Sequence, residues 1–125
     1  VPCCIDQGVG VIPWSPLARG LLTGKKTSKT SMRKNNDALA KEIYYREEDQ
    51  PVIEGVEKLA KETGHKPAQI ALAWILQRPG ITAPIIGASK VNHIDDAVTA
   101  LEIQLSEKQV KALEAPYKPH PILGH

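Results

Sequence analysis

Apolar residues recur at helical spacing between Pro51 and Gly64. The residues that form this stripe are Val52, Val56 and Leu59. Proline is tolerated in the first turn of a helix, and glycine commonly follows the last turn. The stretch therefore predicts an amphipathic helix, with Asp49 or Gln50 as its cap.

The next stretch, PAQIALAWILQR, opens with Pro67 and is apolar around nearly its whole circumference from Ala68 to Leu76. A helix with apolar residues on every side is normally covered on every side. We therefore predict a second helix that needs neighbours on several faces.

Two more helices are predicted towards the C-terminus. The stretch SKVNHIDDAVTAL carries one apolar stripe, formed by Val91, Ile94, Val98 and Leu101. Neighbouring helix positions diverge by about 100 degrees. Asp95 and Asp96 therefore cannot easily share a proton, and we expect one at the surface and the other in a polar contact. A last helix begins at Ser106, with Gln109 in capping-box register, and a proline-rich extended tail follows.

Two short β-branched runs are typical of buried strands. They span Val9 to Pro13 and Ile81 to Ile86, and both are bounded by glycine or proline. Strands that alternate with helices predict parallel pairing and an α/β architecture. Because two strands are too few for a stable parallel sheet, the pattern indicates that part of the fold is missing.

The region from Leu21 to about Gln50 has a weaker pattern. We expect a polar loop followed by a short helix. Five basic residues fall between Lys25 and Lys34 with no acidic residue among them. Nucleic-acid binding is one interpretation, but a solvated loop is favoured because no stacking aromatic residues are interleaved.

Composition places the chain among ordinary globular proteins. It has 125 residues, of which 42% are hydrophobic and 24% charged, and a formal net charge of +2. These values suit one domain over residues 1–125. No apolar run approaches the roughly 20 residues that span a bilayer, and the first residues do not resemble a signal peptide. We expect a cytoplasmic protein with neither a membrane nor a nucleic acid as its partner.

The only two cysteines, Cys3 and Cys4, are adjacent in the sequence. Adjacent cysteines rarely form a disulfide, because the short ring strains its geometry. We expect free thiols that are buried or nearly buried. The four histidines are scattered without metal-ligand spacing, so no metal site is predicted.

Chemistry suited to phosphate follows both predicted strands. After the second strand, Gly87 permits a tight turn, Ser89 offers a hydroxyl and Lys90 a positive charge, directly before a helix. After the first strand, Arg19 and Lys25 lie near further backbone donors. Plainer interpretations stay open at this point: a serine that only caps a helix, a tryptophan in the core, and an ordinary turn.

Three long segments resemble the aldo-keto reductases, especially members related to aryl-alcohol dehydrogenases and to potassium-channel β subunits. The segments are GVGVIPWSPLARGLLTGK, KPAQIALAWILQRPGITAPIIGAS and LEAPYKPHPILGH. The resemblance implies a (β/α)8 TIM barrel that binds NADPH and reduces aldehydes or ketones to alcohols. The chain corresponds to the C-terminal portion of that barrel, which comprises the last two β/α units and the C-terminal helix. It is an incomplete fragment, whose helix IALAWIL we expect to expose several hundred Å² of apolar surface.

The resemblance also assigns cofactor contacts after the first strand. Trp14 takes the position of the aromatic residue that stacks on the nicotinamide. Lys25 matches a basic contact in the loop that folds over the cofactor, and Arg33 a loop arginine near the adenosine phosphate. The residues that line the pyrophosphate are Ser15, Pro16, Leu17, Ala18 and Arg19.

At the second strand end, Gly87 and Ser89 match positions around the adenosine 2′-phosphate. His93 stands where relatives often have glutamine, Asp96 where they have glutamate, and Ala97 where they have asparagine. The change at Ala97 removes hydrogen bonds to adenine. The cationic site favours NADP(H), since each charge-assisted hydrogen bond contributes roughly 1.5 to 3 kcal/mol.

No catalytic residue is predicted in this chain. The family's tyrosine, lysine, aspartate and histidine lie in the first half of the barrel, and Tyr44, Tyr45 and Tyr117 lack the flanking residues of the catalytic tyrosine. We expect the parent protein to act on a small-molecule carbonyl substrate, and this fragment alone to be inactive. The rest of the barrel or another chain would complete the core. The alternative is a non-catalytic nucleotide-binding or oligomerisation module derived from the barrel.

Overall fold

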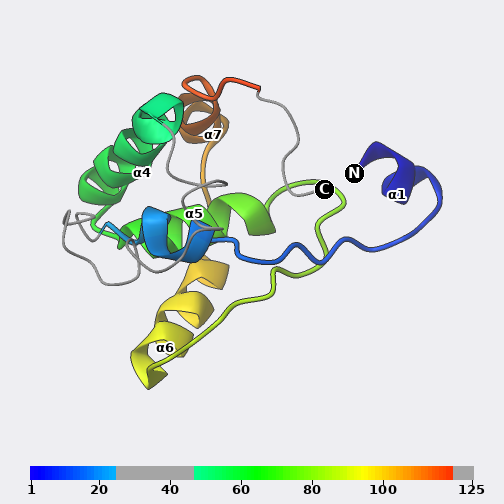
Figure 1. Ribbon diagram of the computed structural model, residues 1–125, viewed down its shortest axis with the longest axis horizontal. Coiled ribbons are helices and arrows are strands. Elements are labelled where there is room, and N and C mark those ends of the chain that lie inside the picture. The colour runs from blue at the N-terminus through cyan, green and yellow to red at the C-terminus, as the bar shows by residue number, and fades with distance from the viewer. Residues whose placement is uncertain (25–46, 120–125) are drawn as a thin grey trace.

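The computed structural model describes residues 1–24 and 47–119 (Figure 1). The expected basic loop and short helix within residues 25–46, and the end of the tail at residues 120–125, lie outside the described residues. The α-helices (α) and 3-10 helices (η) follow in the order α1 (Pro2–Asp6), η1 (Ala18–Thr23), η2 (Glu47–Asp49), α4 (Gln50–Thr63), α5 (Pro67–Leu76), α6 (Val91–Thr99), η3 (Ala100–Glu102) and α7 (Glu107–Glu114).

The predicted starts of α4, α5 and α7 are confirmed, as is the end of α4 at Gly64. Asp49 occupies the N-cap position of α4, and Gly64 ends that helix in the left-handed conformation with φ 73°. Pro67 opens α5. Ser106 caps α7, where its backbone N–H donates to Gln109 Oε1 at 2.8 Å and its Oγ accepts from Gln109 N at 3.4 Å. These contacts form the predicted capping box.

The core is centred on α5. Ile70 and Ala73 are fully buried, and Leu72 is 3% exposed. Helices α4 and α6 contact α5, as do η1 and η3. The expectation that IALAWIL would expose a large apolar surface is therefore wrong, because these elements cover it. The buried core cluster comprises Val56, Leu59, Ala60, Ile70, Ala73, Ile103 and Leu113.

The two predicted strands lie side by side in parallel, but they do not form a continuous sheet. Isolated bridges join Val11 to Ile81 and Trp14 to Ile85. The backbone N–H of Thr82 donates to the carbonyl of Val11 at 2.8 Å. Continuous strands were the wrong expectation for the described residues, because a lone parallel pair has no neighbouring strands to extend its hydrogen bonding.

Helix α6 differs from the prediction at its end and in its surroundings. The predicted helix continues to Leu101, whereas α6 ends at Thr99 and passes into the 3-10 turn η3. Figure 1 shows α6 projecting away from the group formed by α4, α5 and α7. None of its residues is buried. Its apolar stripe is exposed, at 77% for Val91, 50% for Ile94 and 56% for Val98, and Leu101, which continues the predicted stripe into η3, is 61% exposed.

Helix α1 was not predicted from the sequence. Figure 1 places it at the far end of the paired extended segments, away from the other helices. Both cysteines lie on it as free thiols, with Cys3 exposed and Cys4 half-buried. The expectation of buried or nearly buried cysteines is wrong for Cys3, because α1 has no buried residue. Within the described residues, no helix is long and apolar enough to cross a membrane.

Candidate functional site

Trp14 lies at the end of the first extended segment and is 59% exposed. It pairs in parallel with Ile85, whose backbone N–H donates to the carbonyl of Pro13 at 2.8 Å. The interpretation of Trp14 as a core residue is wrong, because most of its surface is accessible. Its pairing places the turn after Trp14 and the loop after Ile85 at the same edge of the paired segments.

The turn after Trp14 holds an unusual backbone. Ser15, Ala18 and Arg19 have φ angles of 50°, 47° and 53°. Left-handed conformations cost non-glycine residues about 1–2 kcal/mol each, and such residues cluster at functional sites. Hydrogen bonds hold the turn, from Ala18 N to Ser15 O at 2.9 Å and from Gly20 N to Leu17 O at 2.9 Å. The five residues predicted to line the pyrophosphate thus share one strained turn.

The second predicted phosphate loop, residues 87–90, is exposed throughout. A Cβ at Gly87 would meet no atom within 4 Å, so the backbone is open to close approach. Lys90, rather than Ser89, takes the N-cap position of α6, and the backbone N–H of His93 donates to its carbonyl at 3.1 Å. The simpler interpretation of Ser89 as the cap of α6 is therefore wrong.

Asp96 directs its carboxylate towards α5. Its Oδ1 lies 2.6 Å from Lys66 Nζ and accepts from Gln69 Nε2 at 3.2 Å. The side chain of Asp96 is 19% exposed and that of Lys66 is 60% exposed. Because Asp95 is exposed on the neighbouring position, the expected division between a surface carboxylate and a polar contact is confirmed.

Sequence reasoning missed Lys66 and Gln69. Gln69 is 7% exposed, and its Oε1 accepts from the backbone N–H of Lys66 at 2.9 Å. One signal for this contact was present, since Gln69 stands at the third helical position after Lys66, as in a capping box. Its bond to Asp96 had no sequence signal.

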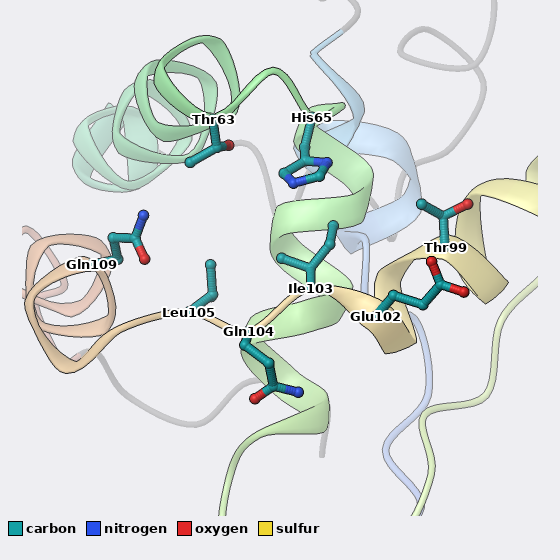
Figure 2. A pocket seen from close by; sticks show the side chains of 8 residues that line it. All are labelled: Thr63, His65, Thr99, Glu102, Ile103, Gln104, Leu105 and Gln109. Carbon is teal, nitrogen blue, oxygen red and sulfur yellow. The ribbon is translucent and has the colours of Figure 1, made fainter.

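A hollow of about 300 Å³ lies between the end of α4 with the turn at His65, the end of α6 with η3, the segment 103–105 and the start of α7 (Figure 2). Several polar groups on its wall are engaged in local bonds. Thr63 Oγ1 donates to Leu59 O at 2.8 Å, and Thr99 Oγ1 donates to Asp95 O at 2.9 Å. None of its lining residues belongs to the predicted cofactor set. In residues 1–24 and 47–119, no group of three or more histidine, cysteine, aspartate or glutamate side chains is arranged to hold a metal ion.

Comparison with known families decides the identity of the fold. The model of the aldo/keto reductase family matches residues 1–118. The chain belongs to the aldo/keto reductase family. Membership in this family and likeness to a solved aldo-keto reductase support a TIM-barrel fold.

Individual aldo/keto reductases and related oxidoreductases resemble the chain over nearly its whole length. It is 38% identical to versiconal hemiacetal acetate reductase of Aspergillus parasiticus, over 98% of this chain and 36% of that protein. It is 41% identical to a Schizosaccharomyces pombe protein provisionally named an aryl-alcohol dehydrogenase, over 99% of this chain and 35% of that protein. The solved thermostable aldo-keto reductase Tm1743, in complex with the inhibitor epalrestat, is 29% identical with a TM-score of 0.63 and covers 93% of this chain and 32% of that one.

This member of the aldo/keto reductase family thus spans about a third of the length of these three relatives, between 32% and 36%. The bridge between Trp14 and Ile85 brings two groups of predicted cofactor residues to one edge. These are the turn from Ser15 to Arg19 and the loop with Gly87 and Ser89. His93 is half-buried in the first part of α6, and Asp96 faces α5. Lys25 and Arg33 lie outside the described residues.

Proposed function

We propose that this chain supplies the cofactor-binding edge of an NADP(H)-dependent aldo-keto reductase that reduces aldehydes or ketones to alcohols. The observation that carries the proposal is the parallel bridge between Trp14 and Ile85. Ligands of α/β barrels bind at the carboxyl ends of the strands, in the loops that follow them. Both predicted phosphate loops follow the bridged residues at that edge.

The residues at this edge fit an extended dinucleotide. Trp14 offers an exposed ring for stacking against the nicotinamide. In the turn from Ser15 to Arg19, the left-handed backbone at Ser15, Ala18 and Arg19 suits backbone contacts to the pyrophosphate. Gly87 leaves open space for the adenosine phosphate, with Ser89 beside it.

Charge supports a preference for the 2′-phosphorylated cofactor. Arg19 and Lys90 belong to the two loops and are both exposed. Lys25 and Arg33 add basic residues in the sequence between the first loop and α4. Hydrogen bonds from charged donors to phosphate are roughly twice as strong as neutral ones. We therefore assign NADP(H) rather than NAD(H) to this edge, with His93 near the adenosine end.

The chain corresponds in this proposal to the C-terminal portion of a single barrel, with its last two β/α units and its C-terminal helix. The exposed stripe of α6 supports the assignment, since the missing part of a barrel would cover such a face. The catalytic residues would come from that missing part. The proposed substrate is a small carbonyl compound, and an aromatic aldehyde suits the name of the Schizosaccharomyces pombe relative. We propose a cytoplasmic location.

The same exposed stripe favours a second candidate function. In this alternative, α6 mediates self-association and the chain serves as a non-catalytic nucleotide-binding or oligomerisation module. Light scattering distinguishes the two proposals, because only the module forms a stable oligomer without further protein.

Complementation tests the proposed enzyme. The chain is assayed for loss of NADPH absorbance with nitrobenzaldehyde, alone and after refolding with the part of versiconal hemiacetal acetate reductase that the chain does not span. We expect turnover only in the mixture, and less turnover when the mixture contains the Trp14→Ala variant. Turnover by the chain alone, or a folded mixture without turnover, would contradict the proposal.

A further inference from the structure

Helix α6 has little apolar attachment to the rest of the described structure. It carries no buried residue, and Val91, Ile94 and Val98 are all at least half exposed. The burial of apolar side chains usually fixes a surface helix in place. Apolar burial begins only beyond its end, at Ala100, which is 1% exposed. The amino-terminal part of α6 therefore depends on other contacts.

The ion pair between Lys66 and Asp96 provides such a contact. It joins the residue before α5 to the middle of α6, with 2.6 Å between Lys66 Nζ and Asp96 Oδ1. The buried side chain of Gln69 adds a second bond to the same oxygen atom at 3.2 Å. Charge-assisted hydrogen bonds of this length are among the stronger polar contacts, and the Asp96 carboxylate is mostly shielded from water.

The position of α6 also sets the position of the loop before it. Lys90 caps the helix, and its carbonyl accepts from the backbone N–H of His93 at 3.1 Å. A displacement of α6 therefore moves Lys90, the residue at which the loop with Gly87 and Ser89 ends. We propose that Lys66 and Asp96 are positioning residues for the adenosine-phosphate loop 87–90. Asp96 acts here through the helix rather than by touching the cofactor, and this role rests on the proposed function of that loop.

Hydrogen exchange of the 125-residue chain tests the attachment without any cofactor. In Lys66→Met, we expect the hydrogen-bonded backbone amides of residues 93–97 in α6 to exchange about threefold to tenfold faster, while amides of α4 stay unchanged. The variant retains the hydrogen bond to Gln69 Oε1, because the backbone N–H of Lys66 donates it. Lys66→Arg keeps the charge and restores slow exchange. Asp96→Asn, which retains the shape of the side chain, accelerates the same amides.

Lys58→Met is the matched control, because Lys58 pairs with Glu62 at 4.0 Å on the exposed face of α4. It leaves exchange in residues 93–97 unchanged. Equal exchange in Lys66→Met and in the unaltered chain would overturn the inference.

Cofactor titration separates a positioning role from a general loss of structure. We expect Lys66→Met to weaken NADPH binding about threefold to tenfold, and to leave unchanged the binding of reduced nicotinamide mononucleotide, which lacks the adenosine half. Equal weakening for both ligands would overturn the positioning role. Failure of the unaltered chain to bind NADPH, with the exchange effect intact, would overturn the proposed function while the attachment of α6 by Lys66 stands.

Discussion

Trp14 and Ile85 are paired in parallel, although they belong to segments far apart in the sequence. The bond from Ile85 N to Pro13 O, at 2.8 Å, fixes their register. Because the side chain of Trp14 is exposed, the pairing presents an aromatic ring next to the segment that leads into the 87–90 loop. This relationship connects the two halves of the proposed cofactor site.

The close approach of the two segments predicts opposite effects for one substitution at two glycines. A Cβ at Gly10 would collide with the side chain of Thr82, whereas a Cβ at Gly55 would meet nothing within 4 Å. Gly10→Ala should lower the free energy of unfolding by about 1–3 kcal/mol through overpacking. Gly55→Ala, inside α4, should raise it by about 0.5–1 kcal/mol. Urea unfolding measures both, and equal effects would contradict the close approach of Gly10 to the Thr82 side chain.

The central place of α5 predicts a large loss of stability on truncation of Ile70. This residue is fully buried, so Ile70→Ala removes buried methyl groups and leaves a cavity. We expect a loss of about 2–5 kcal/mol in the free energy of unfolding. Val91→Ala is the control, since Val91 is 77% exposed, and its effect should stay within about 0.5 kcal/mol. A small effect at Ile70 would show that α5 is not the centre of the core.

Serine substitutions distinguish a helix cap from a residue of the proposed phosphate loop. Ser106 caps α7, so Ser106→Ala should lower the free energy of unfolding by about 0.5–2 kcal/mol. Ser89 does not occupy the N-cap position of α6. Ser89→Ala should therefore preserve stability and weaken NADPH binding. Thermal unfolding and NADPH titration of both variants check this contrast, which a stability loss at Ser89 would contradict.

The contact between α7 and α5 predicts a small effect that depends on salt. Glu114 Oε1 accepts from Arg78 Nη1 at 2.8 Å and from Trp74 Nε1 at 3.0 Å. The side chain of Glu114 is 44% exposed, so water and ions screen its charge. Glu114→Gln should cost about 0.2–1 kcal/mol at low ionic strength, and less in high salt. Urea unfolding at two salt concentrations measures it, and a larger loss in high salt would contradict this account.

Local sequence signals were sufficient for the starts of α4, α5 and α7, but not for the tertiary contacts of these helices. Pro67 and the Ser106 capping box mark helix starts because the relevant bonds lie within one turn. The bond between Lys66 and Asp96 joins residues 30 positions apart, and no local pattern indicates it. The left-handed backbone at Ala18 could not be predicted from the sequence either, because alanine does not favour positive φ.

For the predicted strands, the sequence indicated the extended segments but not the extent of their pairing. Their β-branched composition correctly indicated extended segments, and their order indicated parallel pairing. Composition could not indicate that the pairing would consist of isolated bridges, because the extent of a sheet depends on its neighbouring strands. The exposure of Trp14 likewise depends on which parts of the fold lie beside it.

Fluorescence titration of the Trp74→Phe variant with NADPH and NADH tests the shared cofactor site most directly. Trp14 is then the only tryptophan, since the chain has two. We predict saturable quenching by both cofactors, with NADPH bound about tenfold more tightly because charged groups contact its extra phosphate. Absence of saturable quenching, or equal affinity for the two cofactors, would contradict a site in which Trp14 and the 87–90 loop hold one dinucleotide.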